Sequence, residues 1–164
     1  LEPACDRIVV AGSIRREQPD VGDIELLAIP RVYTAPDLFG KITTYSALDS
    51  LLATLLLNDV LDYRLNKRGQ KTYGPLNKLL RHCDSGISVD IFTTTPENFG
   101  MAWMVRTGPA GFNIRMMVRF RQKGMRGEAY AGVKDVKGQE IECPTEAEVF
   151  RLLGWPYLVP QLRV

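Results

Sequence analysis

The chain has 164 residues, of which 45% are apolar and 24% charged, and its formal net charge is +2 at neutral pH. This composition is ordinary for a globular domain, and no apolar run approaches the roughly 18 residues that a membrane span needs. The three cysteines form no C-x-x-C pair, which disfavours a disulfide framework and a structural zinc site. A single histidine excludes a mechanism that uses several. No secretory signal opens the chain, and we expect a cytoplasmic protein without a membrane contact.

The first half of the chain alternates strand and turn signals. Strand patterns occur at residues 7–11, 23–29 and 86–94. Ser46, followed by Asp49, has the pattern of a helix cap at the start of an amphipathic run over 46–61. Residues 67–70, KRGQ, lie between two segments that read as the arms of a hairpin, and Pro75 favours an edge position for the second arm.

After Pro96 the pattern changes from strands to helices. Helices are predicted at 97–106 and 111–123, then a small hairpin within 128–143, then a helix that Thr145 and Glu148 open with a capping box. We therefore predict an α+β fold with two parts. Residues 1–95 form a mixed sheet with helices on one face, and residues 96–164 form a smaller α/β subdomain.

Two of the predicted strands carry carboxylates at strand spacing. Side chains two positions apart lie on one side of a strand, so Asp23 and Glu25 share a side. Burial is expected for the other side, at Ile24, Leu26 and Ile29 in this strand and at Ile87, Val89 and Ile91 in the later one. If the two strands are neighbours, Asp90 joins Asp23 and Glu25 in a cluster whose charges repel one another unless a cation intervenes. Carboxylate oxygens suit magnesium, and three of them suit a two-metal phosphoryl-transfer site. Alternatively, these are solvated residues on a half-exposed strand.

A Gly12–Ser13 turn ends the first strand and is followed by Arg15 and Arg16. A glycine at a strand exit lets backbone amides approach a phosphate, a serine hydroxyl adds a donor, and arginine adds a charged fork. Phosphate donors beside a metal-binding carboxylate pair are typical of a nucleotide site. Arg15 is interpreted as a solvated charge, with a second phosphate ligand as the alternative.

A basic stretch runs from residue 101 to 127 and contains six arginines and lysines with no acid. Aromatic residues are interleaved with these charges. The stretch indicates either a solvated helix face or a contact with a polyanion. The candidate nucleic-acid contacts are Arg115, Arg119, Arg121 and Lys123.

Three motifs in order resemble the nucleotidyltransferase superfamily, and specifically the family X DNA polymerases typified by DNA polymerase beta. They are AGSIRR at 11–16, VGDIELL at 21–27 and SVDIF at 88–92. RTGPAGFN at 106–113 is similar to the family's turn before a nucleotide-contacting helix. Residues 132–163 resemble the end of the polymerase C-terminal subdomain. The resemblance thus covers nearly the whole chain.

The resemblance implies a palm subdomain over 1–95 and a nucleotide-selection subdomain over 96–164. It implies a DNA repair polymerase that acts as a monomer on a nucleoside triphosphate and a DNA primer and template. Two Mg²⁺ ions, or Mn²⁺, would be held by Asp23, Glu25 and Asp90, and Asp90 would also activate the 3′-hydroxyl. The matching nucleotide contacts are Gly12, Ser13, Arg16, Gly22, Gly108 and Asn113. The lyase and helix-hairpin-helix elements of larger members have no counterpart, so we expect a minimal enzyme or part of a longer chain.

Four positions depart from the family pattern. Glu25 stands where the polymerases usually have an aspartate, which affects rate more than reaction class. Val105 and Arg106 occupy the place of an aromatic pair beside the sugar, so discrimination against ribonucleotides stays open, and Ala110 replaces an acidic residue near the base. RNA or a small molecule as acceptor, or a non-catalytic nucleotide or nucleic-acid binding module, are the alternatives.

Overall fold

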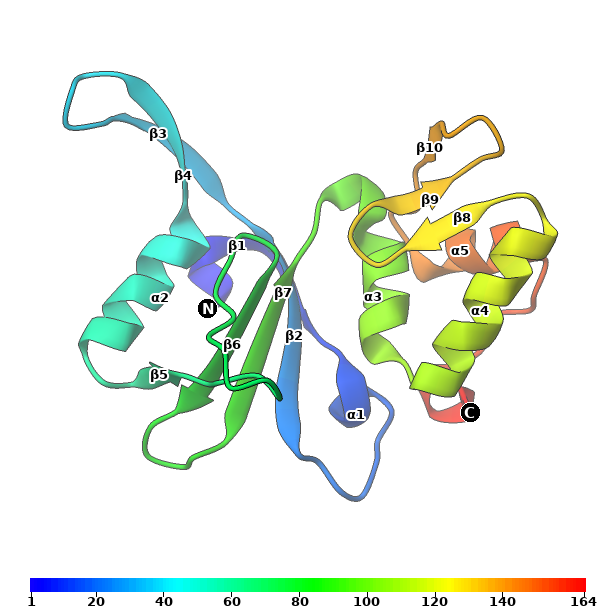
Figure 1. Ribbon diagram of the computed structural model, residues 1–164, viewed down its shortest axis with the longest axis horizontal. Coiled ribbons are helices and arrows are strands. Elements are labelled where there is room, and N and C mark those ends of the chain that lie inside the picture. Colours follow the sequence, from blue (N-terminus) through cyan, green and yellow to red (C-terminus); the bar gives the residue numbers. More distant parts are fainter.

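The computed structural model describes all of residues 1–164 and places two carboxylate-bearing strands side by side in one sheet (Figure 1). The sheet has the order β1-β2-β7-β6-β5. Its strands are β1 (Cys5–Val10), β2 (Asp23–Pro30), β5 (Leu61–Tyr63), β6 (Asn77–His82) and β7 (Ser88–Thr93). The β2 and β7 pair is parallel and the other pairs are antiparallel. The predicted α+β class and mixed sheet are confirmed.

Each face of the sheet packs against a different helix. Leu48 and Leu52 of α2 (Ala47–Leu57) pack against Leu80 and Ile91 on one face. On the other face, Leu27 and Phe92 contact Phe99 and Ala102 of α3 (Phe99–Thr107), which belongs to the second half of the chain. The two parts of the chain therefore meet on the face that α2 leaves uncovered.

The predicted burial pattern of the strands is wrong at two residues. Ile29 packs with Leu27 on the α3 face, because it is an even number of positions from Glu25. Ile87 lies just before β7 and is 45% exposed, since it belongs to the turn that joins β6 to β7.

Helix α2 begins as predicted but is shorter. The Ser46 side chain accepts a hydrogen bond of 3.1 Å from the Asp49 amide. The helix ends at Leu57, because Asp59 has a positive φ of 55° and Leu61 joins β5. The predicted edge position is also wrong: β6 is paired on both sides, Pro75 precedes it, and the short β5 forms the edge.

A two-stranded arm, β3 (Val32–Pro36) with β4 (Ile42–Ser46), projects from the sheet and was not predicted (Figure 1). Tyr33 and Tyr45 stack along it with ring centroids 5.7 Å apart. The enrichment of both strands in β-branched residues and tyrosine is the signal that could have found it.

The second half of the chain has its own core. Its elements after η2 (Pro96–Asn98) and α3 are α4 (Ala110–Gln122), β8 (Arg126–Glu128), β9 (Gly132–Lys134), β10 (Glu140–Ile141), α5 (Glu146–Leu153) and η3 (Pro160–Leu162). Phe112, Phe120 and Phe150 are buried in this core. The predicted capping box of Thr145 and Glu148 is confirmed, whereas the predicted hairpin is a three-stranded sheet. None of the helices has the length and hydropathy required to cross a bilayer.

A buried ion-pair network joins the two halves. Both Arg15, which follows β1 in the short α1 (Gly12–Arg15), and Arg163 bind both oxygens of Glu146, at distances from 2.7 to 2.9 Å. Arg15 also stacks on Trp103, 3.4 Å from a ring centroid. The interpretation of Arg15 as a solvated charge is therefore wrong, because Glu146 and Trp103 occupy its guanidinium.

Candidate active site

The predicted carboxylates lie on neighbouring strands of the sheet. Glu25 is directly opposite Asp90 in the parallel register of β2 and β7, and Asp23 is opposite Ser88. Residues in register on adjacent strands share a face, and this face is the one that α3 approaches rather than the α2 face. Asp90 is 7% exposed, and Asp23 and Glu25 are half-buried. Three acidic side chains from two distant segments are thus brought to one surface.

Burial and mutual repulsion make this surface unfavourable for negative charge. Burial, reinforced by the charges of Asp23 and Asp90, raises the pKa of Glu25 from 4.5 to about 7. Burial also raises the pKa of Asp90, although Arg64 opposes the shift. Carboxylates in this condition are stabilised by any cation that reaches them.

In the structure, arginines supply part of that positive charge. Nη2 of Arg64 lies 2.5 and 2.6 Å from the two carboxylate oxygens of Asp90. Arg106 is half-buried with its guanidinium close to the rings of Phe92 and Tyr130, and its charge lowers the pKa of both Glu25 and Asp90. With Arg64 on Asp90, no three acidic, histidine or cysteine side chains are close enough together to hold a metal ion.

The donor chemistry nevertheless fits a hard divalent cation. Asp23, Glu25 and Asp90 offer only oxygen atoms, which Mg²⁺ prefers, and two of the three are destabilised as anions by burial. A bound cation would offset the cost of burying these negative charges and would reduce their mutual repulsion. The Arg64 side chain is 28% exposed, so solvent is available to it when it leaves Asp90.

The Gly12 turn is built against the carboxylates. Gly12 has a φ of +60°, and a Cβ atom placed on it would overlap the Glu25 carboxylate, so only glycine fits both the turn and this approach. The Ala11 amide donates to the Glu25 carbonyl at 2.8 Å, which fixes the turn to β2. Ser13 follows in α1, which packs against β2 and α3, while Gly22 is exposed just before Asp23.

The turn between α3 and α4 faces α1. Arg16 donates to the Thr107 carbonyl, beside Gly108, whose φ is +65° and whose peptide bond to Pro109 is cis. Asn113 donates from Nδ2 to the Val105 carbonyl at 2.8 Å, whereas its Oδ1 is buried without a hydrogen-bond partner. Arg16 and Gly108 are therefore neighbours where α1 meets the α3–α4 turn, whereas Asn113 lies on α4 against the Val105 carbonyl.

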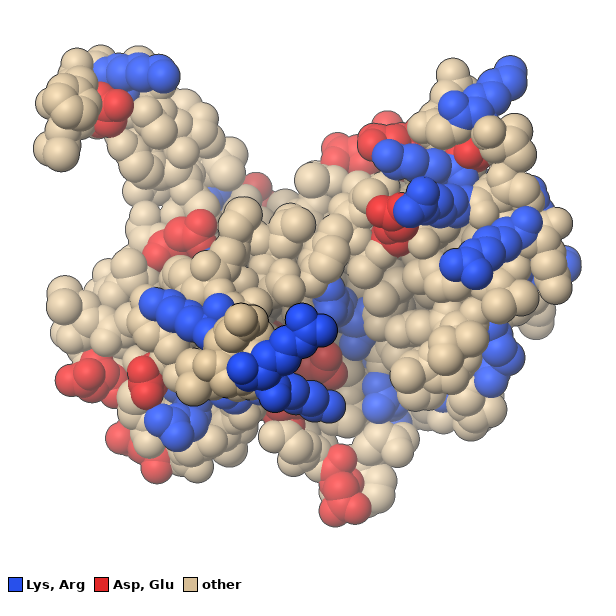
Figure 2. All heavy atoms as spheres, in the orientation of Figure 1, with Lys and Arg blue, Asp and Glu red and all other residues tan.

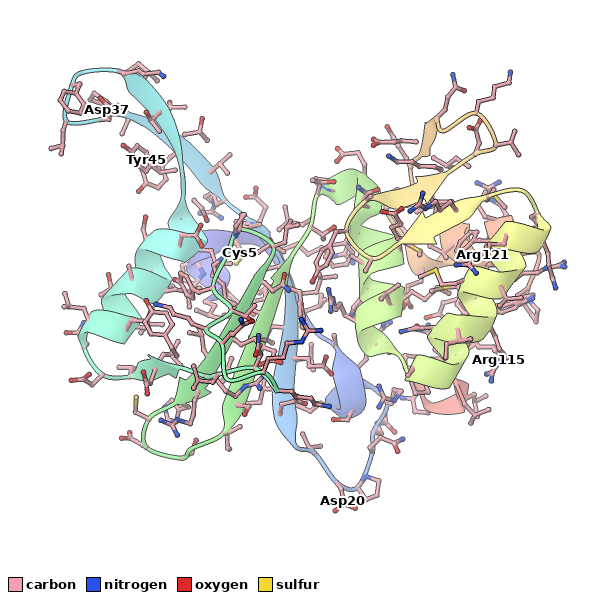
Figure 3. The ribbon with its side chains drawn as sticks, viewed as in Figure 1. Cys5, Asp20, Asp37, Tyr45, Arg115 and Arg121 are labelled. Atoms are coloured by element: carbon pink, nitrogen blue, oxygen red, sulfur yellow. The ribbon has the colours of Figure 1, made fainter.

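The predicted nucleic-acid residues lie farther away. Figure 3 shows Arg115 and Arg121 on α4, which α3 separates from the sheet. Arg115 donates to the Val164 carbonyl and Arg119 to the Leu153 carbonyl, so Arg115 ties the C-terminal residue to α4 and Arg119 ties the end of α5 to α4. The structure does not bring this set together with the carboxylates.

Sequence reasoning missed the role of Arg64. The signal was available, since residues 63–83 contain six arginines and lysines and no acid. Only the tertiary structure shows that the first of them contacts Asp90.

Comparison with known proteins finds similarity to DNA polymerases. The family described as DNA polymerase beta thumb matches residues 102–164. DNA polymerase lambda of Rattus norvegicus is 32% identical over 166 residues, which cover 94% of this chain and 28% of that protein. These matches support a family X polymerase, as the motifs predicted.

Further family X relatives match the chain over most of its length. Repair DNA polymerase X of African swine fever virus, isolate Warthog/Namibia/Wart80/1980, is 23% identical and covers 96% of this chain and 81% of the viral protein. The fold is similar to that of Leishmania infantum polymerase beta in a ternary P/T complex, with a TM-score of 0.71, 21% identity, and coverage of 96% of this chain and 67% of that one. The match to the DNA polymerase beta thumb family, over residues 102–164, lies within the predicted C-terminal subdomain.

Proposed function

We propose that this chain is a DNA polymerase-type nucleotidyltransferase, which adds a nucleoside monophosphate from a (d)NTP to a DNA 3′-hydroxyl and releases pyrophosphate. The observation that carries the proposal is the row of Asp23, Glu25 and Asp90 on β2 and β7, next to the Gly12 turn. The family X relatives, whose names include DNA polymerase and repair DNA polymerase, support it.

Asp90 is the proposed acceptor of the hydroxyl proton. Its side chain is buried on the face of the sheet that packs against α3, and its raised pKa makes the carboxylate a better base than an exposed aspartate. As the proton moves to Asp90, the 3′ oxygen forms a bond to the α-phosphorus. The bond between the α-phosphorus and the bridging oxygen breaks, and pyrophosphate leaves.

Asp23, Glu25 and Asp90 would hold two divalent ions, Mg²⁺ or Mn²⁺, which when bound neutralise phosphate charge and polarise the reacting oxygens. Gly12, Ser13, Arg16 and Gly22 are proposed to orient the triphosphate, since the turn offers backbone amides, a hydroxyl and a guanidinium on one side of Glu25. Gly108 and Asn113 are proposed contacts for the nucleoside.

The two parts of the chain are proposed to divide the work. Residues 1–95 act as the palm, which carries the carboxylates, and residues 96–164 select the nucleotide through the α3–α4 turn. The cations on and directly after α4, Arg115, Arg119, Arg121 and Lys123, are proposed as a second, outer contact for the DNA backbone. Binding through them should weaken steeply as salt rises.

The test is extension of a labelled primer on single-stranded, recessed and one-nucleotide-gapped DNA with each dNTP and NTP. Asp90→Asn should lower the rate by about 10²-fold or more, because removal of one preorganised charged group at the reacting atoms costs several kcal/mol. Asp84→Asn, which changes an exposed aspartate near β7, is the matched control and should extend like the unchanged chain.

Extension by the unchanged chain that persists in Asp90→Asn would contradict the assignment of Asp90. No extension on any of the DNA substrates would contradict the DNA acceptor. Comparison of dNTP with NTP rates also tests whether Val105 and Arg106 admit a ribose.

A further inference from the structure

Arg64 stands in line with the carboxylates across the sheet. Its amide donates to the Leu79 carbonyl at 3.0 Å, Leu79 is opposite Asp90, and Asp90 is opposite Glu25. The backbone therefore fixes where the Arg64 side chain starts, and its guanidinium reaches over Leu79 to both oxygens of Asp90. The register of the sheet therefore determines this contact, and Arg64 is not a freely moving surface arginine.

The ion pair leaves Arg64 incompletely bonded. Nη2 makes both contacts to Asp90, whereas Nε is buried and has no hydrogen-bond partner. A buried donor without a partner costs about 1–3 kcal/mol. Arg64 is thus held on Asp90 by charge while part of its hydrogen-bonding capacity is unused.

Arg64 also begins a basic loop, residues 64–71, that lies over the centre of the molecule. Lys67, Arg68 and Lys71 are exposed and have no acidic partner. Asn66 orders the loop by accepting from the amides of Arg68 and Gln70. Figure 2 shows basic side chains gathered here, where Figure 1 draws the connection between β5 and β6, with acidic atoms next to them.

The Asp90 carboxylate cannot bind Arg64 and a divalent ion with both oxygens at the same time. Both of its oxygens are engaged by Arg64, and a divalent ion bound to the same carboxylate would place two positive groups against each other. Metal binding therefore requires that the guanidinium withdraw. The groups that can receive it are anions close to the basic loop, and the backbone phosphates of a nucleic-acid strand have the matching charge and geometry.

We propose that Arg64 is an exchangeable counter-ion that couples nucleic-acid binding to metal binding at Asp90. Without nucleic acid, Arg64 holds Asp90 and opposes metal binding. When a strand lies along the basic loop, Arg64 moves to a backbone phosphate, and Asp90 becomes free to bind the metal and the 3′-hydroxyl. The inference rests on the proposed function, because it takes Asp90 as a metal ligand, and it assigns Arg64 as a positioning residue.

The experiment measures Mn²⁺ binding by electron paramagnetic resonance of the free ion, at pH 8, without nucleotide. Arg64→Leu should tighten Mn²⁺ binding about tenfold in the absence of DNA, as expected when a competing ion pair worth about 1.4 kcal/mol is removed. A recessed duplex should tighten Mn²⁺ binding to the unchanged chain, after subtraction of binding to DNA alone, and should add little in Arg64→Leu.

Two further variants separate the possible results. Arg81→Leu is the matched control, since it also removes one arginine of an ion pair, here 3.1 Å from the exposed Asp62, and it should bind Mn²⁺ like the unchanged chain. Arg64→Gln replaces Arg64→Leu if circular dichroism shows that the leucine variant does not fold, and it should have the same effect.

Failure of this inference is distinguishable from failure of the proposed function. If Mn²⁺ binding is weaker in Asp90→Asn but unchanged in both Arg64 variants, the role of Arg64 is refuted. The assignment of Asp90 as a metal ligand is then still supported. Unchanged binding in Asp90→Asn would overturn the metal site itself. Equal tightening in Arg81→Leu and Arg64→Leu would also refute the inference, because net charge alone would then explain the effect.

Discussion

Replacement of Glu25 by glutamine should make the protein more stable above neutral pH. Burial and the charges of Asp23 and Asp90 raise the pKa of this carboxyl from 4.5 to about 7. The folded chain therefore keeps a proton that the unfolded chain releases, so the stability contributed by this group falls as pH rises from 4.5 to 7. Above pH 7 the folded state carries the full cost of an ionised Glu25. Glu25→Gln removes this cost and keeps the shape of the side chain.

The size of the effect follows from the two pKa values. The difference between 4.5 and about 7 corresponds to an upper limit of about 3.4 kcal/mol. Glu25 is only partly buried, and solvent screening reduces the expected gain to about 1–2 kcal/mol. Below pH 4.5 the gain should vanish, because both states are then protonated.

The assay is urea unfolding followed by circular dichroism at pH 4, 6 and 8, with a chelator present. Glu142→Gln, which changes an exposed glutamate outside the site, is the control and should show no gain at any pH. A Glu25→Gln variant that is less stable than the unchanged chain at pH 8, or that shows the same gain at pH 4, would refute the reasoning.

Two further predictions concern stability. Glu146→Ala leaves the buried Arg163 without its carboxylate. The free energy of unfolding, measured by urea titration, should therefore fall by about 3–5 kcal/mol. A loss of less than about 1 kcal/mol would show that the network does not stabilise the contact between the halves. Gly12→Ala should lower the free energy of unfolding by about 1–3 kcal/mol, because alanine is strained at the positive φ of this position. It should also slow primer extension, because the new Cβ atom displaces the Glu25 carboxylate. Normal stability together with normal extension would contradict the close contact between Gly12 and Glu25.

The sequence by itself determined most of the elements that carry the proposed chemistry. Period-two patterns located β2 and β7, and the cap at Ser46 and the capping box at Thr145 located two helix starts, because these signals depend on neighbouring residues only. The spacing of Asp23 and Glu25 likewise predicted a shared side of one strand. Local sequence also contains a signal for the β3–β4 arm, its β-branched residues and tyrosines.

Only the tertiary structure decided which groups meet. The parallel register that sets Glu25 opposite Asp90 depends on strand pairing between segments more than 60 residues apart, which no local pattern encodes. The same is true of Arg15, whose guanidinium is bound by Glu146 from the far end of the chain, and of Arg64, whose contact with Asp90 follows from the pairing of β6 with β7. Charged residues look alike in sequence whether solvated or paired, because their partners are chosen by long-range packing.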